Sequence, residues 1–225
     1  KNMQEIGKLI INKHCVRYDF QIISDLIRPN SSVLDIGCGN GELLAYLKKF
    51  KNIKGRGIEI SHQQVSKALI NGISVIQGNA ESDLSYYTDQ NFDYAILSHT
   101  IQAIHKPDEI LKQMLRIAKY AIISLPNFAH FKNRLHLLIN GTMPVNKTIP
   151  YQWYETPNIH FCSIKDFKNL CQKMCFTIKK EVFLTNKHLF SGIFNNSIIA
   201  NFFAEYAIFL LSKEDFAANM EVEFA

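Results

Sequence analysis

The chain has 225 residues, of which 47 % are hydrophobic and 20 % are charged; this composition is typical of a globular protein and excludes collagen-like and disordered classes. At roughly 150 residues per domain, the length predicts one domain with an elaboration. The formal net charge of +5 permits an anionic partner without requiring one. No apolar run reaches the roughly 20 residues that cross a bilayer. The longest candidate, 198–211, contains Asn201 and Glu205, so we expect no membrane span.

Short runs of β-forming residues recur along the first half of the chain, with helical stretches between them. Several of these runs are continuously apolar, which is the pattern of parallel strands covered on both faces. We therefore expect central strands at 33–36, 57–60, 73–77, 92–98 and 120–125.

Capping signals place helices between and after these strands. Ser61 with Gln64 predicts a capping box at the start of one helix, and Ser163 with Asp166 predicts another. Pro107 suits the first turn of a further helix. Scaffold helices need such signals whatever the protein does, so they indicate the fold and not the function.

Two late strands follow, which we expect at 176–184 and 203–211. The alternation then predicts five βα units and a terminal β pair, in a doubly wound α/β fold. The stretch 127–162 contains three prolines, the single Trp of the chain and several Tyr and His residues. We expect this stretch to be irregular and to carry a function, because long loops in compact domains usually do.

Glycines mark the turn after the first strand. Gly37, Gly39 and Gly41 stand between that strand and a helical run, where they let a ligand approach the backbone and the unpaired N–H groups of a helix N-terminus. A dinucleotide fingerprint requires another glycine where this chain has Glu42, so the spacing disfavours NAD. With Asp35 just before it, the Gly-x-Gly-x-Gly turn resembles motif I of the class I S-adenosylmethionine-dependent methyltransferases.

A second acid, Glu59, ends the second predicted strand, where a carboxylate can accept hydrogen bonds from both hydroxyls of a ribose. The methyltransferase resemblance implies that Asn79, after the third strand, contacts the adenine amino group. It also implies that Ser98 and His99, after the fourth strand, line the far side of the cofactor. The implied cofactor is S-adenosylmethionine or its product S-adenosylhomocysteine.

The same resemblance implies a Rossmann-like class I methyltransferase fold. Such a fold has a seven-stranded, mostly parallel sheet with helices on both faces and an antiparallel terminal strand. The predicted cofactor-binding residues are Asp35, Gly37, Gly39, Gly41, Glu59, Asn79 and Ser98.

A narrower resemblance rests on four segments of the chain. The segments 37–44 (GCGNGELL), 92–103 (FDYAILSHTIQA), 123–131 (ISLPNFAHF) and 143–167 look like the MetW family of methionine biosynthesis proteins. The last is the most specific, because its Tyr-Gln-Trp-Tyr run at 151–154 and its Pro-Asn-Ile-His run at 157–160 are not general methyltransferase features.

The resemblance covers 17–212 and implies a single domain there, with 127–162 as an inserted cap and recognition segment, 1–16 as an N-terminal extension and 213–225 as a tail. It implies a methyltransferase-like protein that acts in methionine synthesis with a homoserine O-acyltransferase as its partner. The pattern leaves open whether such a protein transfers methyl groups itself.

Three positions depart from the family pattern at the implied cofactor site. Asn40 and Asn79 stand where family members usually carry Asp, and His99 stands where Gln is common. An Asn carbonyl can still accept a hydrogen bond but lacks the charge of a carboxylate. We therefore expect weaker binding of S-adenosylmethionine than in such relatives.

Methyl transfer from a sulfonium mainly needs an aligned acceptor, so the sequence leaves the catalytic group unassigned. His99, Tyr154 and His160 are the catalytic candidates, and His130 and Tyr151 are further groups that could act as a base or orient a substrate. The alternative interpretation is that these side chains pack the segment 127–162 or form a protein interface, since Tyr and Trp are enriched in interface hot spots.

The sequence is also compatible with two other functions. The first is a self-sufficient methyltransferase acting on a small molecule. The second is an RNA-binding methyltransferase, to which the basic run 48–56 points; a solvated helix end explains that run as well. The chain has Ser-His-Thr-Ile at 98–101 in place of the Asn-Pro-Pro-Tyr element of nucleobase-methylating enzymes, and we expect no nucleic-acid partner.

The cysteine and histidine pattern indicates no metal and no disulfide framework. The five cysteines form no CxxC pair, and the pairs His99 with His105 and His130 with His136 are six residues apart, a spacing that suits neither a helix face nor a strand face. Residues 1–13 contain Glu5 and no sustained apolar run, so we expect no signal peptide. These features predict a reduced, cytoplasmic protein.

Overall fold

The structure is a computed structural model that describes residues 18–146, 148–185, 188–189 and 197–213. The strands are β1 (Ser32–Ile36), β2 (Lys54–Glu59), β3 (Val75–Gln77), β4 (Phe92–Ser98), β5 (Ala118–Pro126), β6 (Phe176–Thr185), β7 (His188–Leu189) and β8 (Tyr206–Lys213). The helices are α2 (Tyr18–Leu26), α3 (Glu42–Lys51), α4 (His62–Ile70), α5 (Ala80–Asp83), α6 (Pro107–Ile117), α7 (Phe131–Asn140), α8 (Ile164–Lys173) and α9 (Ser197–Phe203), with 3-10 turns η1 (Leu84–Tyr86) and η2 (Ile101–Ala103).

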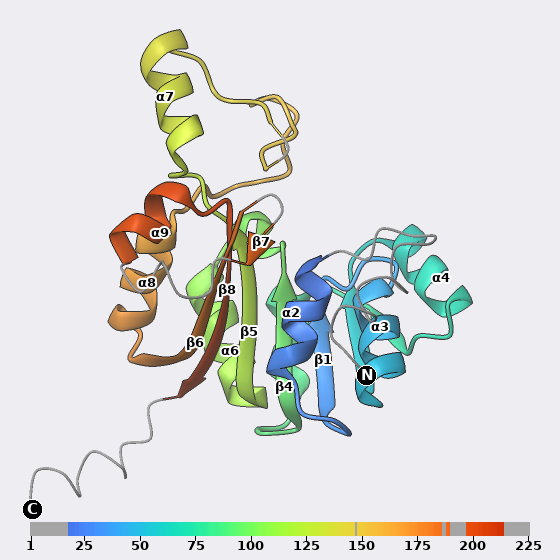
Figure 1. Ribbon diagram of the computed structural model, residues 1–225. Coiled ribbons are helices and arrows are strands. Elements are labelled where there is room, and N and C mark those ends of the chain that lie inside the picture. Colours follow the sequence, from blue (N-terminus) through green and yellow to red (C-terminus); the bar gives the residue numbers. More distant parts are fainter. Residues whose placement is uncertain (1–17, 147, 186–187, 190–196, 214–225) are drawn as a thin grey trace, which may run out of the picture.

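The strands form one sheet in the order β3-β2-β1-β4-β5-β8-β6-β7 (Figure 1). Strands β1 to β5 are mutually parallel, and β8 is antiparallel to both of its neighbours, β5 and β6. The chain order reverses between β1 and β4, which makes their carboxyl ends the switch point at which open α/β sheets bind ligands.

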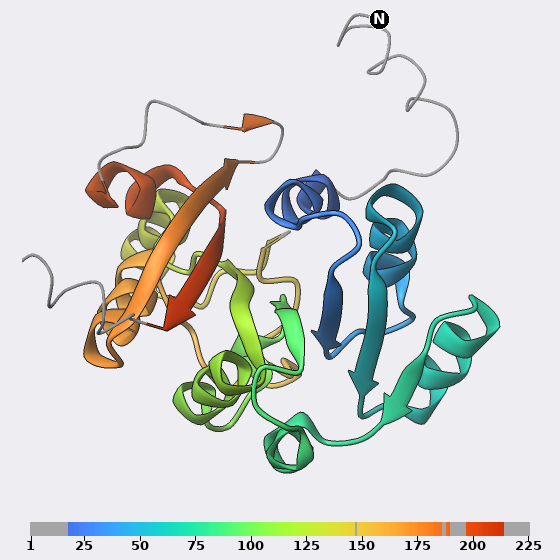
Figure 2. The same cartoon turned by 90° about the horizontal axis from the view of Figure 1, so that it is seen from below.

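Helices cover both faces of this sheet. Seen along the sheet, α2 and α3 lie on one side, and α6 and α8 lie on the other (Figure 2). Neighbouring residues of one strand therefore enter different cores: Val33 of β1 packs with the side chains of α2 and α3, whereas Leu34 packs with those of α6 and α8. This double burial explains the continuous apolar runs of the central strands.

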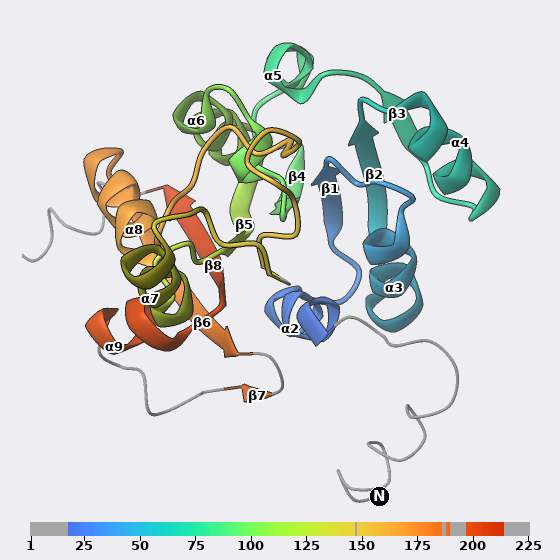
Figure 3. The same ribbon diagram turned by 90° about the horizontal axis from the view of Figure 1, so that it is seen from above.

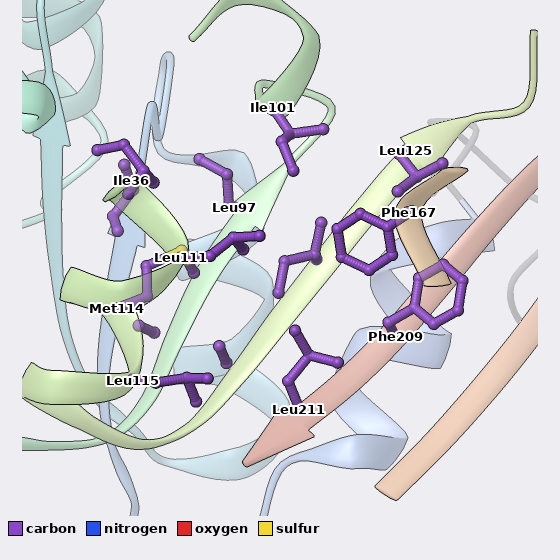
Figure 4. Packing of buried hydrophobic residues seen from close by; sticks show 14 of the residues in the cluster. Ile36, Leu97, Ile101, Leu111, Met114, Leu115, Leu125, Phe167, Phe209 and Leu211 are labelled. Carbon is purple, nitrogen blue, oxygen red and sulfur yellow. The ribbon is translucent and has the colours of Figure 1, made fainter. Parts of the chain in front are cut away.

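The core under α6 and α8 extends to the antiparallel end of the sheet. Figure 4 shows Phe167 of α8 against Phe209 of β8, with Leu111 and Met114 of α6 beside Ile36 and Leu97. The rings of Phe167 and Phe209 have centroids 4.7 Å apart, and both side chains are fully buried. This packing fixes the antiparallel strands on the parallel half of the sheet.

A polar cluster joins three strands at the opposite, amino-terminal edge. The Asp93 carboxylate of β4 accepts hydrogen bonds from the backbone N–H and the hydroxyl of Ser32 in β1, both at 2.9 Å. It also accepts one from Lys119 Nζ of β5 at 3.0 Å. The backbone hydrogen bond from Ser32 and the Lys119 ammonium lower the pKa of the Asp93 carboxyl, against the opposing effect of burial.

This lowered pKa predicts a pH-dependent contribution to stability. Because the folded pKa lies below the ordinary value of about 4, the ionised carboxylate stabilises the fold fully above that value, and the contribution is lost as the pH falls through the folded pKa. Asp93→Asn should therefore lower the urea midpoint at pH 7, and the difference from the unmodified protein should shrink as the pH approaches 3. A difference that is constant with pH would contradict this assignment.

The doubly wound α/β prediction is confirmed, with the predicted parallel strands, the late antiparallel pair and helices on both faces. The capping box of Ser163 and Asp166 is also present at α8, and Pro107 lies in the first turn of α6. The structure adds β7, a two-residue strand paired with the end of β6. The predicted extension 1–16 lies outside the described residues, and so does the predicted tail 213–225 except for Lys213, which ends β8.

Several local predictions were wrong. The stretch 127–162 is not wholly irregular, because it contains α7. The last strand begins at Tyr206 and not at 203, since 197–203 form α9. Ser61 is the N-cap of α4 but its side chain caps nothing. The Ser61 N–H, which would donate to the Gln64 side chain in a capping box, donates to Glu59 Oε1 at 2.9 Å instead.

Candidate functional site

The glycine loop connects β1 to α3 at the switch point. Its first residues are held on the neighbouring strand, because the N–H groups of Gly37 and Cys38 both donate to the Ile58 carbonyl, at 2.8 and 3.2 Å. Gly37 has a φ of +70°, and a Cβ there would lie 2.9 Å from Thr100 Cγ2. A side chain at this position would thus be strained and would clash with the end of β4.

Gly41 serves the scaffold behind the loop. Its φ is +78°, and a Cβ would lie 3.0 Å from Ile73 Cγ1 and 3.3 Å from Ala68 Cβ. Cys38 is similarly enclosed: burial raises the pKa of its thiol to about 12, and any side chain at Gly57 would collide with its sulfur. A thiol with a raised pKa is a poor nucleophile, so Cys38 is a packing residue.

Glu59, the last residue of β2, fixes the middle of the glycine loop through a hydrogen bond to Gly39. Its Oε2 accepts a hydrogen bond from the Gly39 N–H at 2.9 Å, and its Oε1 accepts one from the Ser61 N–H at 2.9 Å. The side chain is only 9 % exposed. A carboxylate has about four acceptor sites, so these two contacts leave capacity for a further donor.

A cavity of about 300 Å³ opens beside this carboxylate. It brings together three of the predicted cofactor residues, Gly37, Glu59 and Asn79. The other lining residues are Ile36, Ile58, Ile60, Gly78, Ala80, Glu81, Thr100, Ala103, Ile104 and His105. Asn79 sits at the entrance to α5, where its Oδ1 accepts a hydrogen bond from the Glu81 N–H at 3.0 Å.

The remaining predicted cofactor residues do not line this cavity. Asp35 is buried within β1, and Gly39 and Gly41 belong to the loop beside it. The Ser98 hydroxyl lies 3.1 Å from the Ser124 hydroxyl, between β4 and β5. Their predicted contact with the cofactor stays a prediction.

Sequence reasoning missed the wall formed by α5 and the residues after β4. Glu81 Oε1 accepts hydrogen bonds from the N–H groups of His105 and Lys106, both at 3.1 Å, and its Oε2 lies 3.0 Å from His105 Nδ1. The hydrogen bond with His105 is the main cause of the lowered pKa of Glu81. The position of 99–105 directly after a central strand could have predicted this wall, because loops at carboxyl ends form the binding crevice.

The catalytic candidates lie in three different surroundings. His99 has a φ of +53°, its Nε2 lies 3.1 Å from Asp19 Oδ2 of α2, and its ring meets the Tyr206 ring edge-on. His160 Nε2 lies 3.2 Å from the carbonyl oxygen of His105, a cavity residue. Tyr154 is 65 % exposed and packs on Trp153. The structure therefore places His160 against the backbone of the cavity residue His105 and leaves Tyr154 on the surface.

The two further groups also differ in environment. His130 is buried, its Nδ1 caps α7 by accepting from the Lys132 N–H at 3.3 Å, and burial lowers the pKa of its imidazole. Tyr151 is exposed. Within the described ranges, no three His, Cys, Asp or Glu side chains lie close enough together to hold a metal ion. Every helix in those same ranges is too short or too polar to cross a bilayer.

Comparison with solved structures supports the fold assignment. A S-adenosylmethionine-dependent methyltransferase from Thermotoga maritima, described as a possible histamine N-methyltransferase, matches with a TM-score of 0.62 over 87 % of this chain and 88 % of its own, at 22 % identity. A S-adenosylmethionine-dependent methyltransferase from Archaeoglobus fulgidus matches with a TM-score of 0.61 over 94 % of this chain and all of its own, at 16 % identity. At such identities the likeness shows the fold alone.

Sequence comparison gives a narrower result. A bifunctional methionine biosynthesis protein, MetXA/MetW, of Rhodopirellula baltica is 36 % identical over 174 residues, which are 73 % of this chain. This chain spans only 28 % of the length of that relative. The family described as "methionine biosynthesis protein MetW" matches residues 17–211. The chain therefore belongs to the MetW family, on a class I methyltransferase fold.

Proposed function

We propose that this protein binds S-adenosylmethionine or S-adenosylhomocysteine in the cavity beside Glu59 and acts in the cytoplasm with a homoserine O-acyltransferase in methionine biosynthesis. The proposed partner rests on one observation. A bifunctional MetXA/MetW protein, which is 36 % identical to this chain over 174 residues, joins both names in a single polypeptide. A protein fused to its partner in one organism is a reasonable separate partner in another. The family resemblance of the 143–167 segment implies the same acyltransferase.

The residues that line the cavity suit the chemical groups of S-adenosylmethionine. Gly37 lines the cavity with bare backbone, and a Cβ there would collide with Thr100, another lining residue, at 2.9 Å. Glu59 offers a carboxylate to the ribose hydroxyls, and the exposed Ile60 side chain and Ile104 supply apolar surface at the same cavity. When bound, S-adenosylmethionine supplies an activated methyl group. The chain's own residues bind and orient it, and the Glu59 carboxylate beside the glycine loop is compatible with a cofactor that has no phosphate.

An exposed aromatic surface, formed by Tyr151, Trp153 and Tyr154, suits the protein partner. Trp153 is 71 % exposed, and its ring stands edge-on to that of Tyr154, with centroids 5.6 Å apart. Monomeric proteins seldom expose such clustered aromatic side chains without a use, and Trp and Tyr dominate interface hot spots. We assign this aromatic surface to contact with the acyltransferase.

Association measurements test this assignment. The purified protein should retain the cognate homoserine O-acyltransferase on a column and change its rate of acyl transfer. Trp153→Ala should weaken association about 30-fold, the loss expected for a hot-spot residue. Tyr86→Ala is the matched control, because Tyr86 is an equally exposed aromatic residue in η1, outside the aromatic surface, and it should bind normally.

Two outcomes would contradict different parts of the proposal. If the unmodified protein neither binds the acyltransferase nor changes its rate, the partner is wrong. If Trp153→Ala associates as tightly as the unmodified protein, the partner stands and the aromatic surface is not the contact.

A second candidate function is methyl transfer to a small molecule by this chain alone. The pair formed by His99 and Asp19 favours it, because a carboxylate behind an imidazole orients the ring and supports proton removal. The pair lies at the carboxyl end of β4, next to Thr100 of the cavity wall. In this function His99 would take the proton that the acceptor loses on methylation.

A further inference from the structure

One stretch of chain touches both the cofactor cavity and the segment that carries the aromatic surface. This stretch is the β4–α6 connection, residues 99–106. On one side Thr100, Ala103, Ile104 and His105 line the cavity. On the other side its backbone carbonyls face the segment between α7 and α8, which crosses over the carboxyl ends of β4 and β5 (Figure 3).

Three hydrogen bonds join that segment to the β4–α6 connection. The Gln102 carbonyl accepts from the N–H groups of Ile159 and His160, at 2.8 and 3.0 Å. His160 Nε2 lies 3.2 Å from the carbonyl oxygen of His105. His105 lines the cavity, and Gln102 precedes the lining residue Ala103. A shift of this wall therefore moves the Gln102 and His105 carbonyls to which the segment is bonded.

The segment has few other restraints between the aromatic surface and these bonds. Residues 151–163 form no regular secondary structure. Within 151–158 the hydrogen bonds are local, from the Glu155 N–H to the Gln152 carbonyl and from the Asn158 N–H to Thr156 Oγ1. Further along, the Cys162 carbonyl accepts from the Phe128 N–H at 3.1 Å, and the Phe161 ring packs on that of Phe128. The chain around Trp153 is therefore held between the buried Ile149 on one side and the bonds to Gln102 of the β4–α6 connection on the other.

The β4–α6 connection itself holds two unfavourable features. His99 has a positive φ, which a residue with a side chain seldom adopts. The Gln102 Oε1 atom is buried without a hydrogen-bond partner, while its Nε2 donates to the His99 carbonyl at 2.9 Å. A buried acceptor without a donor is costly, so a rearranged connection that supplies a donor to Gln102 Oε1 would recover that free energy.

From these contacts we propose that the β4–α6 connection couples the cofactor cavity to the aromatic surface, so that cofactor occupancy controls how tightly the protein holds its acyltransferase partner. The inference rests on the proposed function. A cofactor that packs on Thr100, Ile104 and His105 fixes the connection, and the bonds from Gln102 and His105 then order the segment and the aromatic surface. S-adenosylmethionine contains a methionine unit, so the coupling makes partner binding responsive to the supply of methionine.

The chain contains a built-in reporter for this coupling, because Trp153 is its single tryptophan. Titration of the full chain with S-adenosylhomocysteine should be followed by calorimetry and, in parallel, by Trp153 emission and its quenching by acrylamide. We expect quenching to decrease as the ligand saturates, with the same Kd by both methods. We also expect saturating S-adenosylhomocysteine to tighten acyltransferase binding by about fivefold or more, and the acyltransferase to tighten ligand binding by the same factor.

His160→Ala tests the route of the coupling, and His136→Ala is its matched control. His136 is a half-buried histidine of α7 whose ring lies 3.2 Å from Thr142 Oγ1 and 3.1 Å from Asn140 Nδ2, away from the β4–α6 connection, and its variant should respond as the unmodified protein does. His160→Ala should lose most of the Trp153 response. His160 does not line the cavity, so a change in ligand affinity in this variant would also support coupling.

Different results would contradict the coupling, its route and the proposed cofactor. Ligand binding by calorimetry without any change at Trp153 in the unmodified protein overturns the coupling and leaves the proposed function intact. An unchanged response in His160→Ala overturns this route. No heat of ligand binding in the unmodified protein contradicts the proposed cofactor, and the coupling falls with it.

Discussion

Glu59→Ala is expected to weaken the binding of S-adenosylhomocysteine at least about 100-fold. The substitution removes the acceptor of the Gly39 and Ser61 N–H groups together with the carboxylate proposed for the ribose hydroxyls. Hydrogen bonds to a charged group contribute about 1.5–3 kcal/mol each, and every 1.4 kcal/mol is a factor of ten in Kd. Isothermal calorimetry on the purified protein measures the loss.

Two further variants control this result. Glu42 is an exposed acid on the first turn of α3, and its Oε1 accepts from Asn40 Nδ2; Glu42→Ala should bind within about twofold of the unmodified protein, since exposed charges contribute little. Glu59→Gln keeps one acceptor oxygen, so its affinity for S-adenosylhomocysteine should lie between those of Glu59→Ala and Glu42→Ala. Undiminished binding in Glu59→Ala would show that the ligand site lies elsewhere.

The same variant separates the two candidate functions. With labelled S-adenosylmethionine and cell extract, label in an acceptor that disappears with Glu59→Ala would support methyl transfer by this chain. An effect on the acyltransferase without any label transfer would support the accessory function.

The parts of the site that follow from local chemistry were predictable from sequence. The glycine turn and Glu59 could be assigned because a strand end, a positive φ and a carboxylate at the next strand end each require particular residue types. The capping box at Ser163 was predictable for the same reason, since both of its bonds lie within one turn of chain.

The parts that depend on tertiary packing were not predictable. Helix α7 has apolar residues at helical spacing, Leu135, Leu138 and Ile139, but no local pattern indicates that these side chains are exposed while Asn133 is buried. Figure 1 shows why, because α7 stands away from the sheet. In the same way, the cavity wall at His105 depends on Glu81, which lies 24 positions away in sequence, and no local pattern indicates that pair.

Asn127 is the second position at which a single substitution should have a large effect. It follows β5 directly, at the base of the 127–162 segment, and is completely buried. Its Nδ2 donates to the carbonyls of Asn201 and Ala204, at 2.9 and 2.8 Å, and its Oδ1 accepts from the N–H groups of Ala129 and Ile164, at 3.2 and 3.4 Å. One side chain thus joins β5, α8 and α9.

Asn127→Ala should lower the free energy of unfolding by about 4 kcal/mol. The substitution leaves two carbonyls and two N–H groups without this partner in a dry interior, and each such group costs about 1–3 kcal/mol. For a chain of this size each kcal/mol lowers Tm by about 2–4 °C, so thermal and urea denaturation both report the effect. Asn140→Ala, at an exposed asparagine of α7, should stay within about 0.5 kcal/mol of the unmodified protein. A loss below about 1 kcal/mol in Asn127→Ala would mean that water replaces the amide, and that the end of β5 is held to α8 and α9 by apolar packing instead.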